Sequence, residues 1–171
     1  MNTLLEGPGR MAWHTDLRLV FRALGGRQQE FNWLLTDVEL NCDVTGFPFS
    51  GDPHSKEALW LSGAELTSLV EAHEVQFVWG VLSGFRPETA IDVTRLEPYP
   101  YADGNEALWR PGVRIQHPLA EVEIVCWDSS STLLLSHDDD LTRRFRSFFT
   151  EAVDLDEHNR RASVRDHNAA T

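Results

Sequence analysis

The sequence predicts an α+β fold, in which a mostly antiparallel sheet of about five or six strands carries two main helices packed on one face. Three observations lead to this prediction. Residues 119–149 have the pattern of a strand, a tight turn, a second strand and a helix. Other extended segments alternate apolar and polar side chains. Ser62 and Glu65 have the spacing of a capping box, which opens a second helix.

The unit at 119–149 has the clearest pattern. Over residues 121–126, apolar side chains alternate with mostly acidic ones, as in a strand with one face on a core. The polar run 128–131 predicts a turn, and the leucines at 133–135 return the chain as a more fully buried strand. From residue 139 or 140 the apolar spacing becomes three and four, which predicts a helix folded back over this hairpin. Its apolar positions are Leu141, Phe145, Phe148, Phe149 and Ala152.

The N-terminal segments lead into a single predicted domain at residues 13–153. Residues 1–12 have little to bury and are predicted to be a loose leader. Residues 16–23 alternate and predict a first amphipathic strand. Residues 31–42 predict a second strand, in which a change of phase near Thr36 indicates a bulge or turn.

The middle of the chain combines loops with regular elements. Residues 43–58 are rich in Gly, Pro and polar residues and predict an exposed loop. A helix is expected to follow over residues 62–73, and then a strand over 75–85.

Residues 86–112 hold four of the eight prolines and predict a long irregular excursion, with a helical turn at residues 105–109. A short strand is expected at 113–116. Residues 154–171 are polar and small, which predicts a disordered tail.

Composition restricts the function classes. A formal charge of −12 argues against a nucleic-acid binder, because phosphate recognition requires a clustered basic surface. The longest apolar run, near residues 77–82, is too short for a membrane span, and no signal peptide is evident, so a cytoplasmic protein is expected. Nothing in the sequence calls for a cofactor. Cys42 and Cys126 are interpreted as small buried hydrophobes, with a disulfide between neighbouring strands as the alternative.

The sharpest chemical cluster is the run from His137 to Asp140, with His117 available from a neighbouring segment. Imidazole and carboxylates together can hold a divalent metal or supply a general acid and base. The alternative is capping, because carboxylates at a helix start satisfy free backbone N–H groups. The residues of the metal or acid–base hypothesis are His117, His137, Asp138 and Asp140.

A second candidate is electrostatic. Between residues 36 and 75 the chain has eight acidic residues and one lysine, a local charge of −7. Such a face can steer and seat a basic protein, although a merely solvated surface has the same composition. The predicted contact residues are the acids Asp37, Glu39, Asp43, Asp52 and Glu57, with Trp60 or Phe47 as an anchor.

The six tryptophans divide into two groups. Those within strand patterns are interpreted as core, and those near element ends are left open between core and interface anchor. The first group is Trp33, Trp79 and Trp127, and the second is Trp13, Trp60 and Trp109.

Three segments carry a resemblance: residues 30–34 (EFNWL), 75–85 (VQFVWGVLSGF) and 123–130 (EIVCWDSS). Together they look like small, uncharacterised bacterial α+β proteins, and they are similar in style to immunity proteins of bacterial toxin systems. The resemblance implies a bacterial cytosolic protein and transfers no functional residue.

The sequence therefore favours a non-enzymatic binding protein, most concretely an immunity or inhibitor protein that occludes a basic effector or toxin through its acidic surface. A metal-dependent or acid–base hydrolase is one alternative. A self-assembling structural subunit is another.

Overall fold

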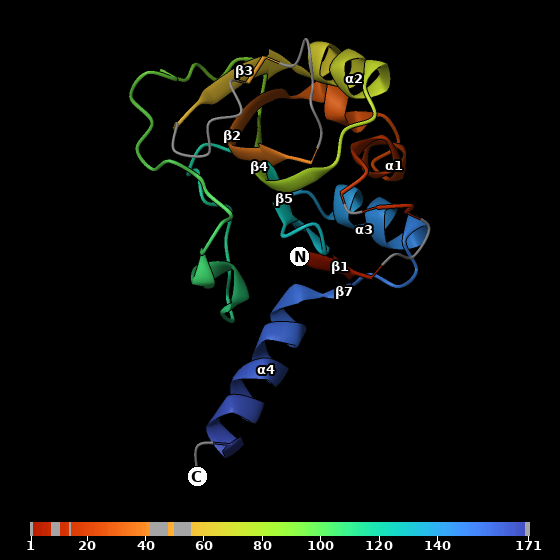
Figure 1. Cartoon of the computed structure of the whole chain (residues 1–171), viewed down its shortest axis with the longest axis vertical. Helices are drawn as coiled ribbons and strands as arrows, with labels where there is room; N and C mark the ends of the chain where they lie inside the picture. The colour runs from red at the N-terminus through yellow and green to blue at the C-terminus, as the bar shows by residue number, and fades with distance from the viewer. Residues whose placement is uncertain (1, 8–10, 14, 42–47, 50–55, 170–171) are drawn as a thin grey trace.

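The computed structural model of the chain describes residues 2–7, 11–13, 15–41, 48–49 and 56–169, with side chains up to residue 165. This part forms one antiparallel sheet of seven strands in the order β3-β2-β4-β5-β6-β1-β7, with four α-helices (Figure 1). The strands are β1 (Thr3–Glu6), β2 (Asn32–Leu40), β3 (Ala58–Ser62), β4 (Phe77–Phe85), β5 (Val122–Trp127), β6 (Ser131–Ser136) and β7 (Val153–Asp154). The helices are α1 (Leu17–Ala23), α2 (Gly63–Ala72), α3 (Asp139–Phe148) and α4 (Leu155–Ala169), with 3₁₀ turns η1 (Arg27–Glu30) and η2 (Glu106–Trp109).

The α+β class and the antiparallel sheet agree with the prediction, but the sheet has more strands and the chain more helices than expected. The hairpin β5-β6, the strand β4, the turn η2 and the bulge in β2 are all present. In α2, Ser62 and Glu65 form the predicted capping box in both directions. These are features that short-range sequence signals determine.

The helix face of the sheet, covered by α1, α2 and α3, holds the main hydrophobic core (Figure 1). Trp33 of β2 and Ile124 of β5 are fully buried there, together with Leu66 of α2 and Phe145 of α3. Trp33 also donates from Nε1 to the Gln28 carbonyl at 2.8 Å. Its predicted place in the core is confirmed.

Residues 16–23, predicted as a strand, form α1 instead. Asp16 caps this helix by accepting from the Arg18 N–H at 3.0 Å. The buried side chains include Leu17, Val20 and Leu24, which have a helical spacing. In so short a segment the apolar residues fit both periods, and docking against α2 and α3 selects the helix.

A long connection at residues 86–121, called the excursion from here on, covers the opposite face of the sheet (Figure 1). This face is called the excursion face. Ala102 and Leu108 of this connection are buried against Val125 and Leu133 of the hairpin. The sheet is therefore buried on both faces, whereas the sequence predicted one covered face. The strand expected at 113–116 is absent from this connection.

Both predicted terminal tails contain regular structure. The expected leader includes β1, whose Leu4 and Leu5 are buried and which lies between β6 and β7. The expected disordered tail is helix α4 up to residue 169. Strand β3, which pairs with β2, also went unpredicted because its sequence was divided between a loop and a helix start.

Candidate binding site

Asp37, a predicted partner contact, is occupied inside the molecule. It lies in the β2 bulge with φ of 52°, and its Oδ2 accepts from the N–H groups of Ala102 at 2.6 Å and Asp103 at 2.9 Å. Its own N–H donates to the Tyr99 hydroxyl at 2.9 Å. Asp37 thus attaches the excursion to the sheet.

The other residues of the predicted acidic site have different surroundings. Glu39 is exposed. Glu57 is partly buried, and its carbonyl accepts from the Tyr99 hydroxyl at 3.0 Å. Trp60 packs against Phe85 with ring centroids 5.2 Å apart, which makes it part of the fold as well as a surface residue. Asp43, Phe47 and Asp52 lie outside the described residues.

In the His/Asp cluster, Asp138 acts as the cap of α3. Its Oδ1 accepts from the N–H of Asp140 at 2.7 Å, and its Oδ2 lies 2.8 Å from the Arg27 guanidinium. Burial opposes ionisation, but these bonds outweigh it and hold the pKa of Asp138 below its usual value. Asp140 pairs with Arg144 at 2.6 Å and with Arg143, so both carboxylates are already neutralised.

The two histidines of that hypothesis are also engaged differently. His117 is buried edge-on against Phe85 at 4.9 Å, its Nδ1 accepts from the Leu119 N–H at 3.3 Å, and burial lowers its pKa. His137 is exposed. Among the described residues, no three His, Cys, Asp or Glu side chains are grouped so that they could hold a metal ion.

Glu123 is a buried carboxylate that the sequence pattern placed on a polar face. Its Oε2 accepts from Ser83 Oγ at 3.2 Å and from the Gln116 N–H at 3.1 Å. Its Oε1 accepts from Gln116 Nε2 at 3.1 Å. Burial raises the pKa of Glu123 to about 7, against these hydrogen bonds. The carboxylate fastens the end of the excursion to β4 and β5.

The only signal for this role in the sequence was the acidic residue inside an otherwise apolar strand. Gln116 extends the network by accepting, at Oε1, from the Tyr101 N–H and from Asn105 Nδ2, both at 3.0 Å. This places Glu123 at the end of a polar network inside the fold, with its oxygens used for structure.

Three partly exposed indoles on the excursion face form a continuous cluster, called the tryptophan patch below: Trp79, Trp109 and Trp127. The Trp127 ring meets Trp79 edge to face at 4.9 Å and Trp109 at 5.1 Å. One side of the cluster packs on the hydrophobic core of the excursion face around Val125 and Leu133, called the second core, and the rest is accessible. The sequence assigned Trp79 and Trp127 to the core, and the structure leaves both partly exposed.

Exposed carboxylates lie beside this patch. Glu39 is directly opposite Trp79 in the β2-β4 pairing, so the two side chains share a face. Asp128 follows Trp127 in the exposed turn of the hairpin. Glu106 precedes Trp109 by one 3₁₀ turn, a spacing that aligns side chains, and its side chain is 85% exposed. Its carboxylate lies 3.5 Å from the exposed Arg110 guanidinium, so three carboxylates and one arginine give the patch a net negative charge. The patch therefore combines indole faces with negative charge.

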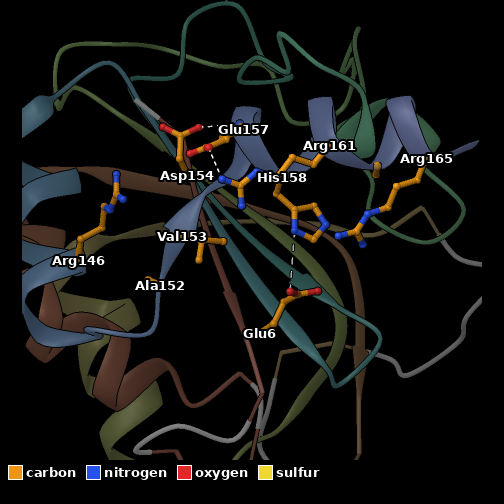
Figure 2. A pocket seen from close by; sticks show the side chains of 10 residues that line it. Glu6, Arg146, Ala152, Val153, Asp154, Glu157, His158, Arg161 and Arg165 are labelled. Atoms are coloured by element: carbon orange, nitrogen blue, oxygen red, sulfur yellow. Dashed lines mark hydrogen bonds and ion pairs between the residues drawn. The ribbon is translucent and has the colours of Figure 1, made fainter. Parts of the chain in front are cut away.

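At the base of α4, a hollow of about 380 Å³ lies between this helix, β7 and the end of α3 (Figure 2). Figure 2 shows Glu6 and His158 facing each other, with Glu6 Oε2 at 3.9 Å from His158 Nδ1. Arg161 pairs with Glu157 one turn earlier on the helix. Arg165 also lines the hollow and forms no ion pair with a described residue, so the hollow contains both paired and unpaired charges.

Cys126 is a free, fully buried thiol whose pKa burial raises to about 12, and Cys42 lies outside the described residues. None of the helices in the described part of the chain is long and apolar enough to cross a membrane. Comparisons with models of protein families, with curated proteins and with solved structures found no match to this chain.

Proposed function

We propose that this protein is a non-enzymatic binding module that occludes a basic partner protein, as an immunity or inhibitor protein does. The observation that carries the proposal is the tryptophan patch with its three neighbouring exposed carboxylates. Tryptophan is one of the residue types enriched among the energetic anchors of interfaces. Of the residues that the sequence suggested for binding, Glu39 belongs to this site.

In the proposed mechanism, the carboxylates and the indoles of the patch have different roles. The carboxylates attract a basic surface and raise the encounter rate, an effect that salt weakens. The indole faces then hold a lysine or arginine of the partner by cation–π contact, worth about 0.5–2 kcal/mol for each contact. Since the indoles are braced against the second core, little side-chain freedom is lost on binding.

The test is retention of a basic protein from host lysate on three immobilised forms of the chain. One is the wild type, and one is the patch variant Glu39→Gln/Glu106→Gln/Asp128→Asn. The third is the control Glu71→Gln/Glu88→Gln/Glu151→Gln, which removes three exposed charges elsewhere. The proposal expects a salt-sensitive basic protein on the wild type and the control, and its loss from the patch variant.

A second patch variant, Trp109→Ala, should lower the affinity for the identified protein by roughly 30-fold or more, the effect of losing an anchor of about 2 kcal/mol. Equal retention on all three charge forms, or a retained partner indifferent to Trp109, contradicts the proposal.

The hydrolase hypothesis has less support. Asp138 and Asp140 are bound to Arg27, Arg143 and Arg144, and His117 is buried against Phe85.

A further inference from the structure

The exposed part of helix α4 is a feature that the proposed function leaves unused. Its first turns are fastened to the excursion, where Asn159 Nδ2 donates to the carbonyls of Leu108 at 3.1 Å and Arg110 at 3.0 Å. From residue 160 to 165 every side chain is exposed, and Figure 1 shows the helix projecting away from the sheet. We call residues 160–169 the arm.

The arm is basic on an acidic molecule. Its sequence has three arginines, Arg160, Arg161 and Arg165, against one acidic residue, Asp166, whereas the whole chain has a formal charge of −12. Arg161 pairs with Glu157, but Arg160 and Arg165 form no ion pair with any residue that the structure describes. Val164, 60% exposed, adds an apolar side chain.

A short, mostly polar helix such as the arm gains stability when it packs against a partner. Isolated helices shorter than about 12–15 residues are marginal in water, and a helix that is polar all round has no core to stabilise it. The arm extends about 15 Å at 1.5 Å per residue, long enough to lie across a patch of three indoles.

The arm begins beside the tryptophan patch. The His158 ring lies 6.0 Å from that of Trp109, so the last supported turn of α4 is at the edge of the patch. The helix then projects away from the sheet (Figure 1). Because the basic arm and the acidic aromatic patch are neighbours on one side of the molecule, a two-fold axis next to them allows each copy to offer its arm to the other.

We propose that this chain self-associates as a symmetric dimer in which the arm of each copy docks on the tryptophan patch of the other. Arginine is suited to this contact, since its guanidinium stacks on indoles and pairs with carboxylates. Two reciprocal contacts are required, because a stable interface buries about 1,200–2,000 Å² in total.

The test measures the molar mass of the purified full chain by sedimentation over a dilution series at low and high salt. The wild type is expected to form a dimer that salt and dilution dissociate. Arg160→Glu/Arg165→Glu is expected to weaken dimerisation by about tenfold or more, since repulsion replaces attraction at both contacts. The matched control Arg22→Glu/Arg95→Glu changes the net charge equally at exposed sites elsewhere and should dimerise like the wild type.

A charge swap makes the test specific for the pairing. Glu39→Lys/Glu106→Lys alone should not dimerise, but an equimolar mixture with Arg160→Glu/Arg165→Glu should form a heterodimer. A wild type that is monomeric at all concentrations, an arm variant that dimerises normally, or a mixture that stays monomeric overturns the proposal. The measurement contains no other protein, so its failure is distinguishable from the failure of partner binding at the same patch.

Discussion

The helix face of the sheet is closed by three helices whose apolar side chains interlock with Trp33, Ile124 and their neighbours. On the excursion face, an irregular connection is held by polar contacts of Asp37 and Glu123 around a smaller core. We therefore expect the helix face to supply most of the folding stability and the excursion face to supply the binding surface. Amphipathic helices bury their apolar side chains and leave few of them available for binding, whereas the irregular cover leaves three indoles partly exposed.

The largest expected effect tests whether the helix face supplies most of the stability. Phe145→Ala should lower the free energy of unfolding by about 3–5 kcal/mol, because it opens a cavity under a fully buried ring. Urea unfolding checks this, with Ser147→Ala at an exposed site on the same helix as control. A loss below about 1 kcal/mol would show that the helix face is not the dominant core.

The next prediction concerns the buried carboxylate of the excursion face. The pKa of Glu123 is raised from 4.5 to about 7 in the folded chain, so the folded state keeps this proton where the unfolded chain has released it. Its contribution to stability is complete below pH 4.5 and is lost as pH rises through about 7, a change of roughly 3 kcal/mol.

In Glu123→Gln this part of the pH dependence should disappear. Denaturant unfolding of wild type and variant across pH 4.5–8 measures it, with the exposed Glu88→Gln as the control that should retain the wild-type slope. Parallel pH profiles for wild type and Glu123→Gln would contradict the assignment.

The smallest effect concerns the attachment of the excursion. Asp37→Ala should cost about 1–3 kcal/mol, because it removes the acceptor for two backbone N–H groups and places alanine at a positive φ. Asp37→Asn keeps an acceptor and tolerates that φ, so it should cost less.

Amide hydrogen exchange in these variants measures the local opening of each face of the sheet separately. The amides of Ala102 and Asp103 should exchange faster in Asp37→Ala while those of α3 stay protected. Equal acceleration on both faces would mean that the excursion does not open separately from the helix face.

The sequence by itself determined those elements that depend on interactions between residues close together in the chain. The β5-β6 hairpin, the capping box of α2 and the cap at Asp138 follow from local hydrogen bonding and from one period of apolar residues. Elements too short for a period to be decisive, such as α1 and β1, needed their packing partners to define them.

Only the tertiary structure decided what the excursion face contains. An alternating strand has the same sequence pattern whether its polar side faces water or another layer. The burial of Glu123 therefore depends on the connection that covers it, in which Gln116 lies seven residues earlier in the chain. Exposure of Trp79 and Trp127 likewise depends on how far that connection reaches. The tryptophan patch joins three segments distant in the chain, and of its acidic neighbours only Glu39 was among the contact residues that the sequence proposed. The periodicity of a sequence predicts which side of a strand or helix a residue lies on. Whether that side is exposed depends on segments far away in the chain, whose positions the periodicity does not give.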